Sequence, residues 1–121
     1  MDIERIRNYC LSLPAVTEDM PFGEGVVVFR LENKIFACIA FDDPFAVTLK
    51  CDPEYALELR EAHSEIDGAF HWNKRHWNSI RFDGKLSDRF IEALVRHAYS
   101  RIVAKLPAKV KAVNPGYLEV V

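Results

Sequence analysis

Long apolar runs are missing from this chain of 121 residues. Its apolar stretches, such as GVVVF and IFACIAF, are strand-sized, whereas a membrane helix needs ~20 such residues. The N-terminal MDIERIRNYC has alternating charges and lacks the apolar segment of a signal peptide. We therefore expect a cytoplasmic protein without membrane contact. The length predicts one domain over residues 1–121, with residues 107–121 as a C-terminal tail.

Cysteines are few, and their spacing fits neither a disulfide framework nor a zinc site. There are three, Cys10, Cys38 and Cys51, which is an odd number, and no two of them form a C-x-x-C pair. Cys51 directly precedes a predicted helix, where a thiol pKa can fall, and His71 or His76 could act as its base. No third orienting group can be named, however, so we expect no enzyme.

Metal and phosphate motifs are also lacking. His71 and His76 are five positions apart, so on one strand they point to opposite faces and converge only across a bend. The five glycines never form G-x-x-x-x-G-K or G-x-G-x-x-G, and no G-x-S-x-G is present. The sequence therefore predicts no metal and no cofactor, and we read the acidic pairs in TED and FDD as solvated turns.

Positive charge is scarce in the first half of the chain and concentrated in the second. The net charge is −2, and acids outnumber bases nine to three between Glu32 and Asp67. Bases dominate from Gly68 onward. An acidic total argues against a strongly basic nucleic-acid-binding domain, but this asymmetry predicts a local positive patch.

Helix and strand signals are clear along most of the chain. Asp2, Asp52 and Ser87 are good N-cap residues, each followed by an apolar pattern of helical period. β-branched and aromatic residues around ENK predict a hairpin, and "DGK" predicts a turn after WNSIRF. The expected helices are residues 2–12, a second from Asp52 to about His63 and a third from Ser87 to Pro107; the expected strands are 26–31, 34–41, 45–50, 69–72 and 77–82.

These elements predict an α+β domain in the order α-β-β-β-α-β-β-α. Short connections favour a largely antiparallel sheet, and its apolar face needs a covering layer of helices, which gives two layers. Residues 14–25 are expected to form a loop. The tail is expected to be irregular and to pack through Tyr117 and Leu118.

The most unusual stretch is FHWNKRHWNSIRF, residues 70–82. It holds two tryptophans, two histidines, two arginines and a lysine, and no acid. Lys74 and Arg75 fall in a predicted turn, where cations could neutralise phosphates. Exposed rings could stack on bases, but a tryptophan on a strand is more often part of the core, so we expect at least one of Trp72 and Trp77 to be buried.

The chain resembles the MmcQ/YjbR-like family of small bacterial proteins. The resemblance rests on LSLPAVTEDMPFG, VFRLENKIFACIAF, VTLKCDPEYALELRE, HWNKRHWNSIRFDGKLSD and ALVRHAYSRIVAKL, in that order, and is carried most specifically by PFG, LKCDP and NKRHWN. It implies a compact α+β domain like the CyaY and secretion-chaperone folds, a DNA-binding role and no catalytic residues to transfer. Trp72 departs from the pattern, which has a smaller apolar residue there.

Together, the residues and the resemblance predict a monomeric protein that binds DNA weakly and electrostatically. Lys74 and Arg75 would contact phosphates, Asn73 a base or sugar, and Trp72 or Trp77 would stack or hold the turn. The alternative is a protein-interaction module that uses the sheet surface. The predicted nucleic-acid-binding residues are Lys50, His71, Asn73, Lys74, Arg75, His76, Trp77 and Arg81.

Overall fold

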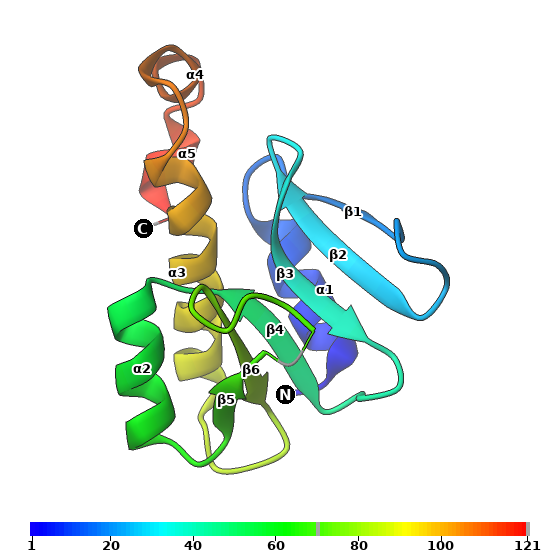
Figure 1. Ribbon diagram of the computed structural model, residues 1–121. Helices are drawn as coiled ribbons and strands as arrows, with labels where there is room; N and C mark the ends of the chain where they lie inside the picture. Colours follow the sequence, from blue (N-terminus) through cyan, green and yellow to red (C-terminus); the bar gives the residue numbers. More distant parts are fainter. Residues whose placement is uncertain (70, 121) are drawn as a thin grey trace.

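The computed structural model describes residues 1–69 and 71–120, and it has two layers (Figure 1). One layer is a six-stranded antiparallel sheet, and helices cover one of its faces. The predicted α+β class is therefore confirmed. The elements are α1 Ile3–Ser12, β1 Thr17–Asp19, β2 Val26–Leu31, β3 Lys34–Ala40, β4 Ala46–Lys50, α2 Pro53–Ala62, β5 Ile66–Gly68, β6 Trp77–Arg81, α3 Asp88–Ala104, α4 Ala108–Val113 and α5 Gly116–Glu119.

All three predicted helix starts carry a side-chain cap. The Asp2 carboxylate accepts a hydrogen bond from the Arg5 backbone N–H at 2.8 Å, and the Ser87 hydroxyl accepts one from the Phe90 N–H at 3.1 Å. The Asp52 carboxylate accepts two, from the first turn of α2. Each cap satisfies donors that have no partner inside the helix, which is why these three starts could be predicted from sequence.

The strand order is β1-β2-β3-β4-β6-β5. Pairing between β4 and β6 extends over the whole of both strands, from Ala46 opposite Arg81 to Lys50 opposite Trp77. In contrast, β3 and β4 are in register only at Ala37–Leu49 and Cys38–Thr48. These two strands therefore diverge beyond a short contact, as Figure 1 shows below the centre of the sheet.

The core lies between the sheet and the helices. Alternate residues of β4 and β6, including Val47, Leu49 and Ile80, are buried on this face, and α3 packs over β3 and β4. Tyr99 of α3 is fully buried there. The opposite face carries no helix, as Figure 1 shows, which leaves it available for loops and ligands.

The predicted loop at residues 14–25 contains a strand. β1 pairs antiparallel with β2, and the Asp19 carboxylate accepts a hydrogen bond from the Arg30 guanidinium at 3.0 Å. The prediction was wrong here because the strand TED does not alternate apolar and polar residues, and three residues are too few to show such a pattern. Its position is fixed by partners on β2.

The predicted strand at residues 69–72 is displaced in the structure. β5 is Ile66–Gly68, within a segment expected only to end the preceding helix, whereas Ala69, His71 and Trp72 follow it outside any strand. Phe70 lies outside the described residues. Ile66 is buried opposite Ile80. Core packing therefore favours pairing of residues 66–68 with β6 over pairing of the predicted strand at residues 69–72.

The C-terminal tail is also more regular than predicted, because it forms α4 and α5. Tyr117 packs as expected and is 3% exposed, whereas Leu118 is 56% exposed and does not. The Tyr117 hydroxyl donates a hydrogen bond to the Glu32 carboxylate at 2.7 Å, and its ring lies 6.3 Å from that of Tyr99. The tail is thus attached to both α3 and the β2–β3 turn. Within the described residues, no helix is long and apolar enough to cross a membrane.

We expect the Tyr117–Glu32 contact to make stability fall at alkaline pH. The hydrogen bond to the carboxylate, followed by burial, raises the pKa of Tyr117 to about 12. The folded state therefore holds this proton more tightly than the unfolded state, in which the pKa is about 10. The stabilisation is present below pH ~10 and is lost as the pH rises through 12. Urea unfolding at several alkaline pH values should give a shallower decline for Tyr117→Phe than for wild type; equal declines would contradict this.

Candidate basic surface and open-face groove

The aromatic and basic run forms a compact turn between β5 and β6. The Asn73 side-chain carbonyl accepts a hydrogen bond from the Arg75 N–H at 3.0 Å, and the Asn73 backbone carbonyl accepts one from the His76 N–H at 3.0 Å. The Cys51 N–H donates to the His76 carbonyl at 2.8 Å, which joins the turn to the end of β4. Asn73 therefore shapes the turn, and Lys74 and Arg75 lie exposed on it.

Arg60 of α2 holds this turn from the helix side, a role not predicted from the sequence. Its guanidinium donates to the Lys74 and Trp77 carbonyls and, at 2.7 Å, to the side-chain carbonyl of Asn78. A Cβ added at Gly68 would lie 3.2 Å from the Arg60 Cζ atom, so a larger residue there would require the arginine to shift. In the sequence, an arginine on a helix surface is expected to be a solvated charge. The contacts of Arg60 with the turn could therefore not be predicted.

The two tryptophans stack beside one another. Trp77 is 7% exposed and Trp72 is half-buried, with ring centroids 4.5 Å apart. Phe22 meets the Trp72 ring edge-on at 6.2 Å, and the Lys50 ammonium lies 5.2 Å from the centroid of Trp77. Trp77 is therefore mainly structural, as expected, while Trp72 keeps an exposed surface.

Positive side chains from four parts of the fold converge at this end of the sheet. We call Lys34, Lys50, Arg75, His76, Arg101 and Lys105 the basic surface. Burial, then Lys105, Arg101 and Lys34, lowers the pKa of Lys50. Partial burial, then Lys50, Arg75, Lys105 and Arg101, lowers the pKa of His76.

A depression of about 440 Å³ opens at the basic surface. Its lining includes Arg30, Lys34, Lys50, Arg101 and Lys105. Two carboxylates lie beside this lining: Asp19 is 3.0 Å from the Arg30 guanidinium, and Asp52 is 3.8 Å from that of Arg101. The predicted turn thus joins the C-terminal end of α3. Arg101 of that helix and its C-cap residue Lys105 belong to the surface, although neither was predicted from the sequence.

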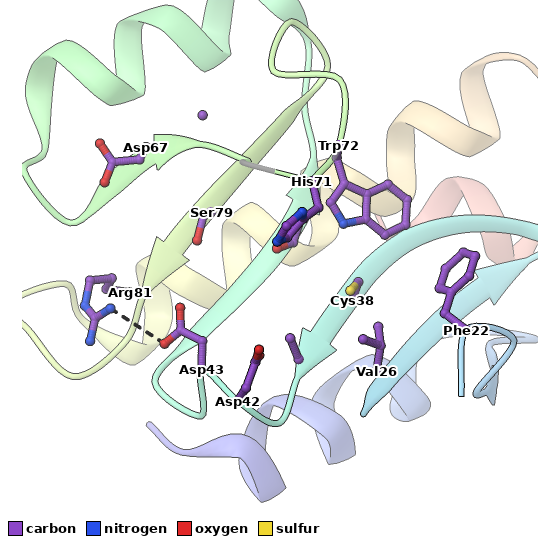
Figure 2. A pocket seen from close by; sticks show the side chains of 13 residues that line it. Phe22, Val26, Cys38, Asp42, Asp43, Asp67, His71, Trp72, Ser79 and Arg81 are labelled. Atoms are coloured by element: carbon purple, nitrogen blue, oxygen red, sulfur yellow. Dashed lines mark ion pairs between the residues drawn. The ribbon is translucent and has the colours of Figure 1, made fainter. Parts of the chain in front are cut away.

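Two of the predicted residues, Arg81 and His71, lie elsewhere. Arg81 is at the far end of β6, where its guanidinium pairs with Asp83 at 3.0 Å and Asp43 at 3.7 Å; these contacts raise its pKa. His71 is exposed and lies beside Trp72 (Figure 2). The predicted set is therefore divided: Lys50, Arg75 and His76 belong to the basic surface, and Asn73 and Lys74 lie on the same turn, whereas Arg81 and His71 lie apart from it.

A groove of about 860 Å³ occupies the helix-free face of the sheet (Figure 2). Its floor is a row across four adjacent strands, in which Cys38, Thr48, Ser79 and Asp67 lie opposite one another in turn. Small side chains in this row leave room above the sheet. The lining residues around the floor include Phe22, Trp72 and His71 from two loops and Asp42 and Asp43 from the β3–β4 connection.

None of the cysteines has the character of a nucleophile. Burial raises the pKa of Cys51 to about 11 despite its place before a helix, and it raises that of Cys38 to about 11. Cys10 reaches about 12 for the same reason. All three thiols are therefore protonated at neutral pH. In residues 1–69 and 71–120, no group of three His, Cys, Asp or Glu side chains is arranged to hold a metal ion.

Comparison with known proteins places the chain in a family. The YjbR family model matches residues 11–101. The chain is 32% identical over 108 residues to the Escherichia coli K12 protein "Uncharacterized protein YjbR", covering 88% of this chain and 92% of that one. It is 30% identical over 116 residues to "Uncharacterized protein YbdF" of Escherichia coli O157:H7, covering 93% and 94%.

Solved structures agree in fold. The crystal structure of the Deinococcus radiodurans protein DR2400, a DUF419 domain, superposes with a TM-score of 0.82 at 30% identity, covering 91% of this chain and 85% of that one. A Pseudomonas syringae crystal structure superposes with a TM-score of 0.69 at 25% identity, covering 81% and 96%. These matches confirm the predicted resemblance: the chain belongs to the YjbR family.

Proposed function

We propose that this protein is a non-enzymatic DNA-binding protein whose basic surface contacts phosphates. The observation that carries the proposal is the convergence of Lys50, Arg101 and Lys105 with the basic turn. Burial lowers the pKa of Lys50 most, and repulsion from Lys105, Arg101 and Lys34 lowers it further. A phosphate placed among them relieves that repulsion and releases counterions from the DNA.

The structure favours a different set of contact residues from the one predicted. Lys50, Lys74, Arg75 and His76 stay in the set, because Lys74 is exposed on the same turn as Arg75, and Lys34, Arg101 and Lys105 join it. Arg81 leaves it because it lies at the far end of β6 from Lys50, where Asp83 and Asp43 pair with it. Trp77 supports the surface from below, because the Lys50 ammonium lies over its ring.

The proposal leaves catalysis aside for a physical reason. A cysteine nucleophile acts as its thiolate, and the raised pKa values of Cys51 and Cys38 oppose that form. Contact through a few cations on an otherwise acidic protein should be weak and strongly dependent on salt.

A fluorescence-polarisation titration with short single-stranded and duplex DNA tests the proposal. Replacing Lys50 and Lys105 by glutamine should weaken binding about tenfold or more at ~50 mM salt, and should reduce the slope of log K against log salt by about 2 for two lost contacts. The pair Lys85→Gln and Arg89→Gln removes the same charge at the other end of α3 and should change the affinity far less. If wild type binds neither DNA, or if the two double variants bind alike, the proposal fails.

The alternative of a protein-interaction module keeps one observation in its favour. Met20, Phe22, Phe41 and Phe45 are large apolar side chains exposed in the loops beside the sheet. Exposed apolar groups of this kind mark protein contacts when they form a continuous patch. A purified partner that binds wild type after nuclease treatment, together with no DNA binding in the titration above, would favour this alternative.

A further inference from the structure

The groove on the helix-free face differs in charge from the basic surface. Of its charged side chains, three are carboxylates, from Asp42, Asp43 and Asp67, and one is the guanidinium of Arg81. Arg81 is already shared between Asp43 and Asp83. Within residues 1–69 and 71–120, neither Asp42 nor Asp67 has an ion-pair partner, so the groove attracts positive charge.

One wall of the groove is aromatic. Trp72 contributes a half-buried ring and Phe22 a ring that is 62% exposed, and their edge-on contact at 6.2 Å fixes their relative orientation. Figure 2 shows both rings on one side of the floor, with Asp42 and Asp43 beside it. The negative face of an aromatic ring attracts cations, most strongly for tryptophan. Aromatic and acidic groups therefore favour the same kind of ligand.

The floor provides hydrogen-bond acceptors but no backbone partners. Thr48 and Ser79 line the groove, and the strands that carry them, β4 and β6, pair with one another along their whole length. An extended peptide is usually recognised by backbone pairing at a sheet edge, which a sheet face does not offer. A small molecule needs only side-chain contacts, and the volume of about 860 Å³ is in the range of small-molecule sites.

The geometry points to a binding site for a small organic cation, an ammonium or guanidinium group on an apolar body. The apolar body lies against Trp72 and Phe22, and the charged end faces the carboxylates of the groove, with Asp42 beside the floor and Asp67 at the end of the floor away from the rings (Figure 2). This site is separate from the proposed DNA contact, because the stacked tryptophan pair stands between the groove and Lys50.

Three probes that share a benzyl or phenyl group test this inference: benzylammonium, benzyl alcohol and benzoate. Binding is followed by NMR through the side-chain indole N–H signals of the two tryptophans. We expect benzylammonium to bind about tenfold more tightly than the alcohol, with benzoate weakest, because two unpaired carboxylates favour the cation. The Trp72 signal should move, and it is identified by its loss in Trp72→Leu.

Matched variants separate the groove from the protein's general negative charge. Asp42→Asn with Asp67→Asn should remove most of the preference for benzylammonium, and Trp72→Leu should weaken its binding about two- to fivefold. Glu58→Gln with Glu61→Gln removes the same charge from the exposed surface of α2 and should leave both unchanged. Equal affinity for the three probes, tighter binding of benzoate, or equal effects of the two charge pairs would overturn the inference. The same variants are also titrated with DNA. Their DNA affinity tests the proposed function, and their benzylammonium affinity tests this inference, so either can fail without the other.

Discussion

Replacing Tyr99 by alanine is expected to lower the free energy of unfolding by about 3–5 kcal/mol, the range for removing a buried aromatic ring. Tyr99 is fully buried at the centre of α3. Its ring meets Phe36 edge-on at 5.7 Å and Tyr117 at 6.3 Å, so one side chain joins the sheet, α3 and α5. Its hydroxyl donates a hydrogen bond to the Pro14 carbonyl at 2.8 Å, which also fixes the segment after α1.

Urea unfolding followed by circular dichroism measures this effect, and conservative variants divide it. Tyr99→Phe keeps the ring and loses only the Pro14 contact, so it should cost about 1–2 kcal/mol. Tyr55→Phe is the matched control, because no hydrogen bond of its hydroxyl occurs among the described residues, and it should change stability by less than ~0.5 kcal/mol. A cost below about 2 kcal/mol for Tyr99→Ala would show that the core can close around the lost ring.

The fold was predictable wherever a short-range signal existed. The three helix starts could be predicted because each cap residue is adjacent in sequence to the helix it caps. These residues are Asp2, Asp52 and Ser87. β1 and β5 carry no such signal. Each is three residues long, and each exists because it pairs with a longer strand, Thr17 with Arg30 and Ile66 with Ile80. Tertiary pairing fixes elements this short, so propensity does not identify them.

The candidate site was only partly predictable for a related reason. The turn that carries Arg75 and His76 is contiguous, so its charge and composition were visible in the sequence. Arg101 and Lys105 are about one helical turn apart on a helix that packs behind the sheet, and only the fold brings them to Lys50. The groove floor likewise requires the strand order β3-β4-β6-β5, which aligns side chains that are distant in sequence.

The turn itself depends on one buried polar side chain, so Asn78→Leu is expected to cost about 2–3 kcal/mol of unfolding free energy. Asn78 is 0% exposed, accepts a hydrogen bond from Arg60 at 2.7 Å and donates one to the Ala56 carbonyl at 3.3 Å. Leucine is close in size, so little cavity forms. The loss instead comes from the Arg60 guanidinium and the Ala56 carbonyl, which would remain in a partly buried position without this partner. Urea unfolding measures the change.

A double-variant cycle shows whether Asn78 acts through Arg60. Arg60→Met also removes the donor to the Lys74 and Trp77 carbonyls, so the turn should loosen. Hydrogen exchange measures this, because the Cys51 N–H that donates to the His76 carbonyl should then exchange faster with solvent. Because the two side chains share one hydrogen bond, the double variant should cost less than the sum of the single variants, by about 1 kcal/mol or more. Ser79→Ala, on the same strand but facing the groove, should stay within ~0.5 kcal/mol of wild type. Strict additivity, or a neutral Asn78→Leu, would mean that packing rather than this hydrogen bond holds the turn that presents Arg75 and His76.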